Sequence, residues 1–513
     1  MRLPSLALLA VTLSAGPSLV AQSATQCSEL SGLKIAGVEI TSTRFQSAVD
    51  KAPAANPWDY SGPLPEHCRV EGVIDRRTGA GGEEFGIRFA IAMPTDWNGD
   101  YLQQGGGGGN GTVALPVGPT AAGTKPALLR GFAVASTDTG HKAHSGPFDF
   151  AFMRDQQAML DFAFEANVRV ASAAREILAA YYRKPAAFSY FAGCSTGGRE
   201  GMILSQRFPD AFNGIISGDP AMRTGLSNIA IGPWSESAWN RIAPKDANGK
   251  AQLALALTDA DRKLVMDALL ARCDAKDGIA DGMISNPLAC DFSPEQIACK
   301  QGQTSGCLAP EKAAAIAHVF SGPKTSRGFQ VYPGFLYDTG IAERGFAHGL
   351  LVPGPGPVLA PFSGTEFDVD EAIRTASDPL VEPLSTNLST FAAHKGKLIF
   401  FHGDSDPWFS PLDTLEYYQS LAAANGGADR VAGFSQIYLV PGMGHCGGGP
   451  ALDQFDLLTP LVDWVEKGEA PHSVTATGRA FPGRSRPLCP FPQHAQFNGS
   501  GNPEEAASFT CQQ

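Results

Sequence analysis

A five-residue motif at positions 193–197, Gly-Cys-Ser-Thr-Gly, limits the possible folds of this chain more than any other feature. The motif directly follows a short apolar run, residues 188–192, and precedes a segment, residues 198–207, that favours a helix. A serine between small residues at such a junction fits a tight strand-to-helix turn, which exposes its hydroxyl above a sheet. A phosphate-binding turn is the alternative, but the motif lacks its lysine. We therefore interpret Ser195 as a nucleophile.

The segments around this motif alternate between helical and strand-like patterns. Residues 153–182 are rich in alanine and contain neither glycine nor proline, which predicts a helix. Residues 397–402 and 436–440 are short apolar runs that each end in a polar loop, which predicts buried parallel strands. This alternation predicts an α/β fold, specifically an α/β-hydrolase core.

Residues 221–389 interrupt the alternation. They are rich in turns and contain four of the ten cysteines. We therefore predict that residues 22–220 and 390–513 form the two parts of one core, and that residues 221–389 form an inserted lid domain. A chain of 513 residues is long enough for both.

The first 21 residues predict a signal peptide, because a positive charge precedes a short apolar run and small residues follow. We therefore expect a secreted or periplasmic protein. A net charge of −12 argues against a nucleic-acid partner and against an anionic membrane, since both require local positive potential.

A serine nucleophile needs a base and an acid, which in this fold follow it along the chain. The strand at residues 436–440 leads into a glycine-rich loop that contains His445, the predicted base. The strand at residues 397–402 leads into Asp404 and Asp406, and spacing alone does not separate these two candidates for the acid.

Acyl transfer also needs two hydrogen-bond donors for the developing oxyanion. The N–H of Thr196, next to the nucleophile, is one candidate. The glycine-rich segment at residues 105–111 is the candidate for the other, and a flexible linker is its alternative interpretation.

Three carboxylates, Asp274, Asp277 and Asp281, lie within eight residues among glycines. Such a loop suits a hard cation with oxygen ligands, although composition alone leaves a solvated acidic turn equally open.

The even number of cysteines fits disulfide bonds in an exported protein. Short loops favour the pairs Cys273–Cys290, Cys299–Cys307 and Cys489–Cys511. A bridge between Cys194 and Cys446 would tie the nucleophile turn to the base loop, and would leave Cys27 and Cys68 as the last pair.

Four segments together resemble the tannase/feruloyl esterase family: residues 64–68, 193–202, 440–446 and 486–490. The resemblance implies that Asp406, the last residue of the pattern H-G-x-x-D, is the acid, and that Gly108 is the second oxyanion donor. It implies the same five disulfides. It also implies a structural Ca²⁺ ion in the lid, held by Asp274, Asp277, Ile279, Asp281 and Met283.

The resemblance further implies a serine carboxylic-ester hydrolase that needs no organic cofactor. Its partner would be a small aromatic ester of the feruloyl or galloyl type, free or linked to a plant polymer, with Phe409 and Trp408 in the pocket. A monoester of terephthalate is the alternative substrate, and Arg327 and Arg344 are the candidates to bind its carboxylate. An inactive, calcium-stabilised, secreted binding protein is the alternative from another class.

Overall fold

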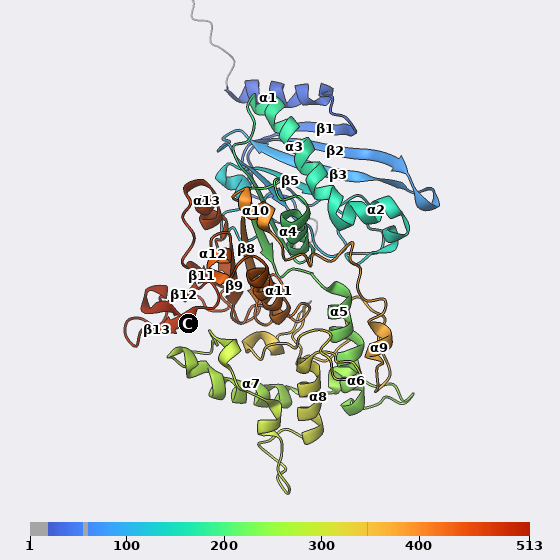
Figure 1. Cartoon of the computed structure of the whole chain (residues 1–513), viewed down its shortest axis with the longest axis vertical. Coiled ribbons are helices and arrows are strands. Elements are labelled where there is room, and N and C mark those ends of the chain that lie inside the picture. Colours follow the sequence, from blue (N-terminus) through green and yellow to red (C-terminus); the bar gives the residue numbers. More distant parts are fainter. Residues whose placement is uncertain (1–18, 55–59, 346) are drawn as a thin grey trace, which may run out of the picture.

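The computed structural model describes residues 19–54, 60–345 and 347–513 (Figure 1). The predicted signal peptide, residues 1–21, lies almost entirely outside these residues. The first described element, α1 (Leu19–Glu29), begins within its last residues. Among the described residues, no helix has the length and apolar character needed to span a bilayer.

The described residues form a nine-stranded mixed sheet with the order β1-β2-β3-β5-β4-β6-β7-β8-β9. The strands are β1 (Val38–Gln46), β2 (His67–Thr78), β3 (Glu84–Pro94), β4 (Tyr101–Gln104), β5 (Ala133–Thr137), β6 (Ser189–Cys194), β7 (Gly214–Gly218), β8 (Lys397–Gly403) and β9 (Ser435–Val440). The pairs among β1, β2, β3 and β5 are antiparallel, and the pairs from β5 to β9 are parallel. The predicted α/β-hydrolase fold class is confirmed, and an antiparallel part extends the parallel sheet that the sequence predicted.

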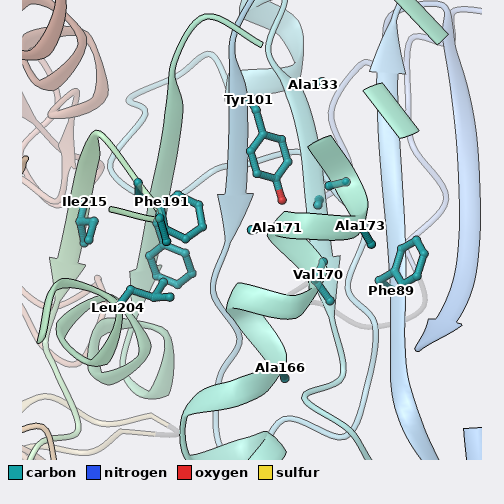
Figure 2. Packing of buried hydrophobic residues seen from close by; sticks show 14 of the residues in the cluster. Phe89, Tyr101, Ala133, Ala166, Val170, Ala171, Ala173, Phe191, Leu204 and Ile215 are labelled. Atoms are coloured by element: carbon teal, nitrogen blue, oxygen red, sulfur yellow. The ribbon is translucent and has the colours of Figure 1, made fainter. Parts of the chain in front are cut away.

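Helices cover the sheet on both faces. Figure 2 shows α3 (Ala166–Tyr182) packed against the strands through small and branched side chains, with Val170 and Ala173 near Phe89 of β3. The buried positions of α3 recur at helical spacing. Alanine at many of them lets the helix lie close to the sheet.

The predicted helix over residues 153–182 is confirmed from Gln156 to Tyr182, with one irregularity, and its first residues belong to a separate 3-10 turn, Ala151–Arg154. It consists of α2 (Gln156–Leu160), a π-helical turn at Asp161–Glu165, and α3. A π turn breaks the regular backbone ladder and leaves carbonyls that need other donors. The guanidinium of Arg199 supplies them, because it donates to the carbonyls of Phe162 and Ala163 at 2.9 and 3.1 Å.

The segment predicted as the lid contains helices and turns, with no strand among its described residues. Its α-helices are α5 (Thr224–Ile229), α6 (Ser235–Ile242), α7 (Asp259–Cys273), α8 (Pro310–Ser321) and α9 (Val369–Ala372). They gather at one end of the molecule, away from β1–β3 (Figure 1). They enclose an apolar cluster of their own, which includes Trp239, Val265 and Ile316.

The remaining α-helices are α4 (Thr196–Arg207), α10 (Ser389–Ala393), α11 (Pro411–Ala424), α12 (Ala428–Ala432) and α13 (Leu458–Lys467). Two small sheets near the C-terminus consist of β10 (Gln454–Phe455), β11 (Val474–Thr477) and β12 (Ser485–Leu488), and of β13 (His494–Phe497) and β14 (Phe509–Gln512). The ten cysteines form five disulfides, Cys27–Cys68, Cys194–Cys446, Cys273–Cys290, Cys299–Cys307 and Cys489–Cys511. These are the pairs that the resemblance implied.

Candidate active site

Ser195 occupies the turn between β6 and α4. Its backbone has φ 63° and ψ −123°, a conformation that is costly for a residue with a Cβ atom. The Ser195 N–H donates to the Gly218 carbonyl at 3.0 Å, and its carbonyl accepts from the Ala221 N–H at 3.1 Å. A Cβ atom on Gly193 would lie 2.6 Å from the Gly197 carbonyl, so the turn requires glycine there. The predicted strand, turn and helix around Ser195 are present.

Asp406 and His445 form a hydrogen-bonded pair beyond the ends of the neighbouring strands β8 and β9. Nδ1 of His445 lies 2.7 Å from Oδ2 of Asp406, and both side chains are buried. The other oxygen of Asp406 accepts from the N–H groups of Trp408 and Phe409 at 2.8 and 3.1 Å. Because the carboxylate accepts at Nδ1, the neutral imidazole carries its proton there and leaves Nε2 as the basic nitrogen.

The charges of this pair support each other. Burial alone lowers the pKa of His445, but the charge of Asp406 and its hydrogen bond outweigh burial and raise this pKa above its usual value. Burial acts to raise the pKa of Asp406, yet the charge of His445 and the hydrogen bonds from His402 and His445 hold that pKa well below its usual range. Asp406 therefore stays ionised.

Asp404, the other candidate for the acid, occupies a different environment. It is buried, and neither of its carboxylate oxygens has a hydrogen-bond partner among the described residues. Burial, together with the charges of Asp338 and Asp219, raises the pKa of Asp404 well above its usual value. Of the two candidates, Asp406 is the one that contacts His445.

The nucleophile turn and the base loop are joined covalently. The disulfide Cys194–Cys446 links the residue before Ser195 to the residue after His445, and the Cα atoms of the two cysteines lie 6.0 Å apart. Sγ of Cys446 lies 3.7 Å from Nε2 of His445. The basic nitrogen therefore lies beside the bridge that leads to Ser195.

The glycine-rich loop at residues 105–111 packs against α4. The buried carboxylate of Glu200 accepts from the Gly106 N–H at 3.1 Å and from Nδ2 of Asn110 at 2.7 Å. Gly108 has φ 57°, and a Cβ atom there would lie 2.2 Å from the Pro147 carbonyl oxygen. These contacts favour a fixed loop over a flexible linker.

Two backbone amides beside Ser195 remain available. The Thr196 hydroxyl donates to the Gly108 carbonyl, which joins the two predicted oxyanion residues. Within the described chain, neither the Gly108 N–H nor the Thr196 N–H donates to another protein group. Both residues line the same cavity as Ser195. The two N–H groups are therefore both candidate donors for an oxyanion in this cavity.

That cavity has a volume of about 290 Å³ and mostly apolar walls. Trp408 and Phe409, the predicted pocket residues, line it, and their rings lie 4.8 and 5.3 Å from the imidazole of His445. Further apolar walls come from the core and from the predicted lid: Phe148, Phe150, Met153, Phe162, Met222, Ile231 and Val358.

The cavity lining includes one cationic and two acidic side chains among the described residues: Arg199, Asp378 and Glu382. The guanidinium of Arg199 donates to three backbone carbonyls, including that of Val381 at 3.2 Å. Arg327 and Arg344, the carboxylate-binding candidates, do not line the cavity, and Arg344 is paired with Asp259.

The predicted calcium residues share one loop after α7. Asp274 accepts from the Asp281 and Gly282 N–H groups at 3.1 and 3.0 Å, and the Met283 N–H donates to Asp281 at 3.1 Å. The Ile279 N–H lies 3.3 Å from Oδ1 of Asp277.

The carboxylate and carbonyl oxygens of this loop fit a calcium ion in their chemistry. However, Asp281 forms an ion pair with Arg486. Within the described chain, the three aspartates do not each bring a carboxylate oxygen to within 4.8 Å of the others. The Ca²⁺ ion stays a prediction.

Four buried polar residues near the triad were missed at the sequence level: Glu200, Asp219, Asp338 and His402. Asp219 directly follows β7, and polar residues at the carboxyl ends of parallel strands are common site residues. That position is a signal that could have identified it. The contacts of the other three depend on tertiary structure.

Known proteins resemble this chain over most of its length. A family model described as "Tannase and feruloyl esterase" matches residues 68–347 and 365–512. The mono(2-hydroxyethyl) terephthalate hydrolase of Piscinibacter sakaiensis is 38% identical, over 90% of this chain and 87% of that protein. A probable feruloyl esterase of Arthroderma benhamiae is 28% identical, over 98% of this chain and 96% of that protein.

Solved structures share the fold. The crystal structure of feruloyl esterase B from Aspergillus oryzae has a TM-score of 0.78 at 24% identity, and covers 95% of this chain and 100% of its own. A tannin acyl hydrolase from Aspergillus niger has a TM-score of 0.71 at 21% identity, with 97% of this chain and 96% of its own covered.

Proposed function

This chain belongs to the tannase and feruloyl esterase family and is a carboxylic ester hydrolase, and from this premise we propose that it is a secreted serine esterase for aromatic esters of the feruloyl or galloyl type. Ser195 is the nucleophile, His445 the general base and Asp406 the acid that orients it. The observation that carries the proposal is the 2.7 Å contact between Asp406 and Nδ1 of His445, in a loop bridged by a disulfide to the residue next to Ser195.

The reaction proceeds in two acyl-transfer steps. Nε2 of His445 takes the proton of Ser195 as its oxygen attacks the ester carbonyl, and the imidazolium is stabilised by Asp406. The N–H groups of Gly108 and Thr196 donate to the oxyanion. The alcohol leaves with the proton from His445, and water then repeats the sequence to release the acid and regenerate Ser195.

The shape and charge of the cavity favour an uncharged aromatic acyl group. The phenylalanine and tryptophan rings in its lining suit a flat ring, and a volume of about 290 Å³ suits a small ester. The substrate is a small ester, free or attached to a plant polymer.

A monoester of terephthalate is the second candidate, favoured by the 38% identity to the hydrolase of that substrate. Its free carboxylate would share the cavity with Glu382 and Asp378. Arg199, the cationic side chain in the described lining, already donates to backbone carbonyls. This charge pattern ranks the terephthalate monoester below feruloyl and galloyl esters.

The test compares kcat/KM of the purified enzyme on methyl ferulate, methyl gallate and mono(2-hydroxyethyl) terephthalate, with Ser195→Ala as control. We expect the highest value on one of the two phenolic esters and none in the control. Highest activity on the terephthalate monoester would reverse the substrate assignment. Undiminished activity of Ser195→Ala would disprove the serine mechanism.

Export and calcium complete the proposal. Five disulfides and the apolar N-terminal segment favour a secreted or periplasmic enzyme. A structural Ca²⁺ ion would be held by the carboxylates of Asp274, Asp277 and Asp281 and by the carbonyls of Ile279 and Met283. Expression with the complete N-terminus and mass analysis of the exported protein tests cleavage near residue 21.

A further inference from the structure

Asp219 is a buried carboxylate that lies outside the proposed triad and contacts the segments that carry all three of its members. It follows β7 directly and has φ 35°, an uncommon backbone conformation for a residue other than glycine. Its side chain is fully buried. A strained, buried and ionisable residue at the carboxyl end of a central strand calls for a functional explanation.

The carboxylate of Asp219 contacts three loops, two of them through hydrogen bonds. Its Oδ1 accepts from the Gly403 N–H at 2.7 Å, three residues before Asp406, and its Oδ2 accepts from the Cys446 N–H at 2.6 Å, next to His445. Oδ2 also lies 3.3 Å from Sγ of Cys194, the residue before Ser195. Its own N–H donates to the Phe401 carbonyl at 2.9 Å.

His402 connects this carboxylate to Asp406. Nε2 of His402 lies 3.7 Å from Asp219 and 3.4 Å from Asp406, and 2.9 Å from the Phe409 carbonyl. Since a carbonyl can only accept, Nε2 carries a proton. Nδ1 forms a hydrogen bond of 2.9 Å with the Thr414 hydroxyl. The imidazole therefore holds an N–H between two carboxylates.

We propose that Asp219 is a positioning residue for ester hydrolysis: it fixes the acid loop and the base loop against the nucleophile turn, and its negative charge supports the positive charge that His445 acquires. The proposal rests on the serine mechanism proposed above. The groups that face Asp219 are His402, His445 and Asp406, and Asp404 lies within range of its charge. The charge of Asp219 contributes to the raised pKa of His445.

The test uses Asp219→Asn, which keeps the shape of the side chain but removes its charge and one acceptor. We expect kcat to fall about 10-fold or more with KM nearly unchanged, because a small misplacement of reacting groups is costly. We also expect the acidic limb of the pH profile of kcat/KM to move to lower pH, since the charge that raises the pKa of His445 is lost.

Asp404→Asn is the matched control. Asp404 belongs to the same buried group, but its oxygens have no hydrogen-bond partner among the described residues, and its raised pKa favours the neutral form. This variant should keep the wild-type kcat and pH profile. A variant of Asp219 that only destabilised the fold would lower the melting temperature and leave both kinetic readouts of the folded fraction unchanged.

Asp219→Glu covers the case in which Asp219→Asn does not fold. It keeps the charge on a side chain that is one methylene longer. We therefore expect kcat to fall, while the acidic limb of the pH profile of kcat/KM stays near that of the wild type. The proposal would be overturned if folded Asp219 variants had the kcat of the wild type and the same acidic limb in the pH profile of kcat/KM. If Ser195→Ala kept activity, the serine mechanism itself would fail, which is a distinguishable result.

Discussion

In the proposed mechanism, the imidazole of His445 must be neutral before it can accept a proton from Ser195. Burial lowers its pKa, but Asp406 outweighs burial and holds the pKa above the usual value of a histidine. The neutral form, and with it activity, is lost as the pH falls through this raised pKa. We therefore predict that the acidic limb of kcat/KM lies above pH 6.5, the usual histidine value. A limb at or below that value would contradict the assigned pair.

Glu382 gives a second prediction for a single residue. It lines the cavity and is buried, which raises its pKa. At alkaline pH its carboxylate should repel an anionic substrate, so the wild type should prefer dimethyl terephthalate, which is neutral, to monomethyl terephthalate, which is charged. Glu382→Gln should lower the ratio of kcat/KM for dimethyl terephthalate to kcat/KM for monomethyl terephthalate by about 3- to 10-fold.

The control for this change is Asp378→Asn. Asp378 lines the same cavity but is exposed, so solvent screens its charge and the preference should change less. An unchanged preference in Glu382→Gln would show that charge at this position does not select the substrate.

The choice between two neighbouring aspartates shows a limit of prediction from residue spacing. Asp404 and Asp406 both follow β8, and their spacing gave no reason to choose between them. The family pattern H-G-x-x-D selects Asp406, and in the structure Asp406 is the carboxylate that lies 2.7 Å from Nδ1 of His445. Asp404 faces a cavity shared with Val440 and Pro441 instead.

At the scale of elements, the glycine-rich loop allows a paired test. A Cβ atom at Gly108 would lie 2.2 Å from the Pro147 carbonyl oxygen, whereas a Cβ atom at Gly107 meets nothing within 4 Å. We predict that Gly108→Ala lowers kcat roughly 10²-fold, the cost of losing one oxyanion donor. Gly107→Ala should stay near the wild type. Equal kcat values for the two variants would contradict the assignment of Gly108 as an oxyanion donor.

The central elements were predictable from the sequence, and the first strand, β1, was not. The run that became β6 is apolar and almost wholly buried, so its pattern alone identifies a core strand. The strand β1 has no buried residue, and its conformation depends on antiparallel pairing with β2. Such pairing leaves little trace in the apolar pattern. The π turn at Asp161–Glu165 likewise depends on a distant partner, Arg199.

At the scale of the whole molecule, the predicted lid forms direct hydrogen bonds with the loops that contain Asp406 and His445. Asp338, from the lid segment, accepts from the Gly442 N–H at 2.6 Å and from the Ser405 hydroxyl at 2.9 Å. The Gly340 N–H donates to the same hydroxyl at 2.9 Å. The predicted lid segment is therefore hydrogen-bonded to the loops of Asp406 and His445, and it also forms walls of the cavity. Sequence patterns within either part alone could not predict these contacts.

The calcium prediction belongs to this scale, because its loop contacts the C-terminal strand β12 through Asp281 and Arg486. A bound ion at a hundredfold excess over its Kd would stabilise the fold by about 2.7 kcal/mol. Chelation should therefore lower the melting temperature and leave kcat unchanged below the transition, and added Ca²⁺ should restore stability. A melting temperature indifferent to both chelator and calcium would rule out the ion.

The most direct measurement concerns the covalent intermediate. The enzyme is mixed with methyl ferulate, quenched in acid during turnover, digested and analysed by mass spectrometry. A feruloyl group on the peptide that contains Ser195, absent in the Ser195→Ala variant, is the predicted result. An acyl group on another residue, or full hydrolysis by the Ser195→Ala variant without any acylated peptide, would contradict the assignment of Ser195, His445 and Asp406.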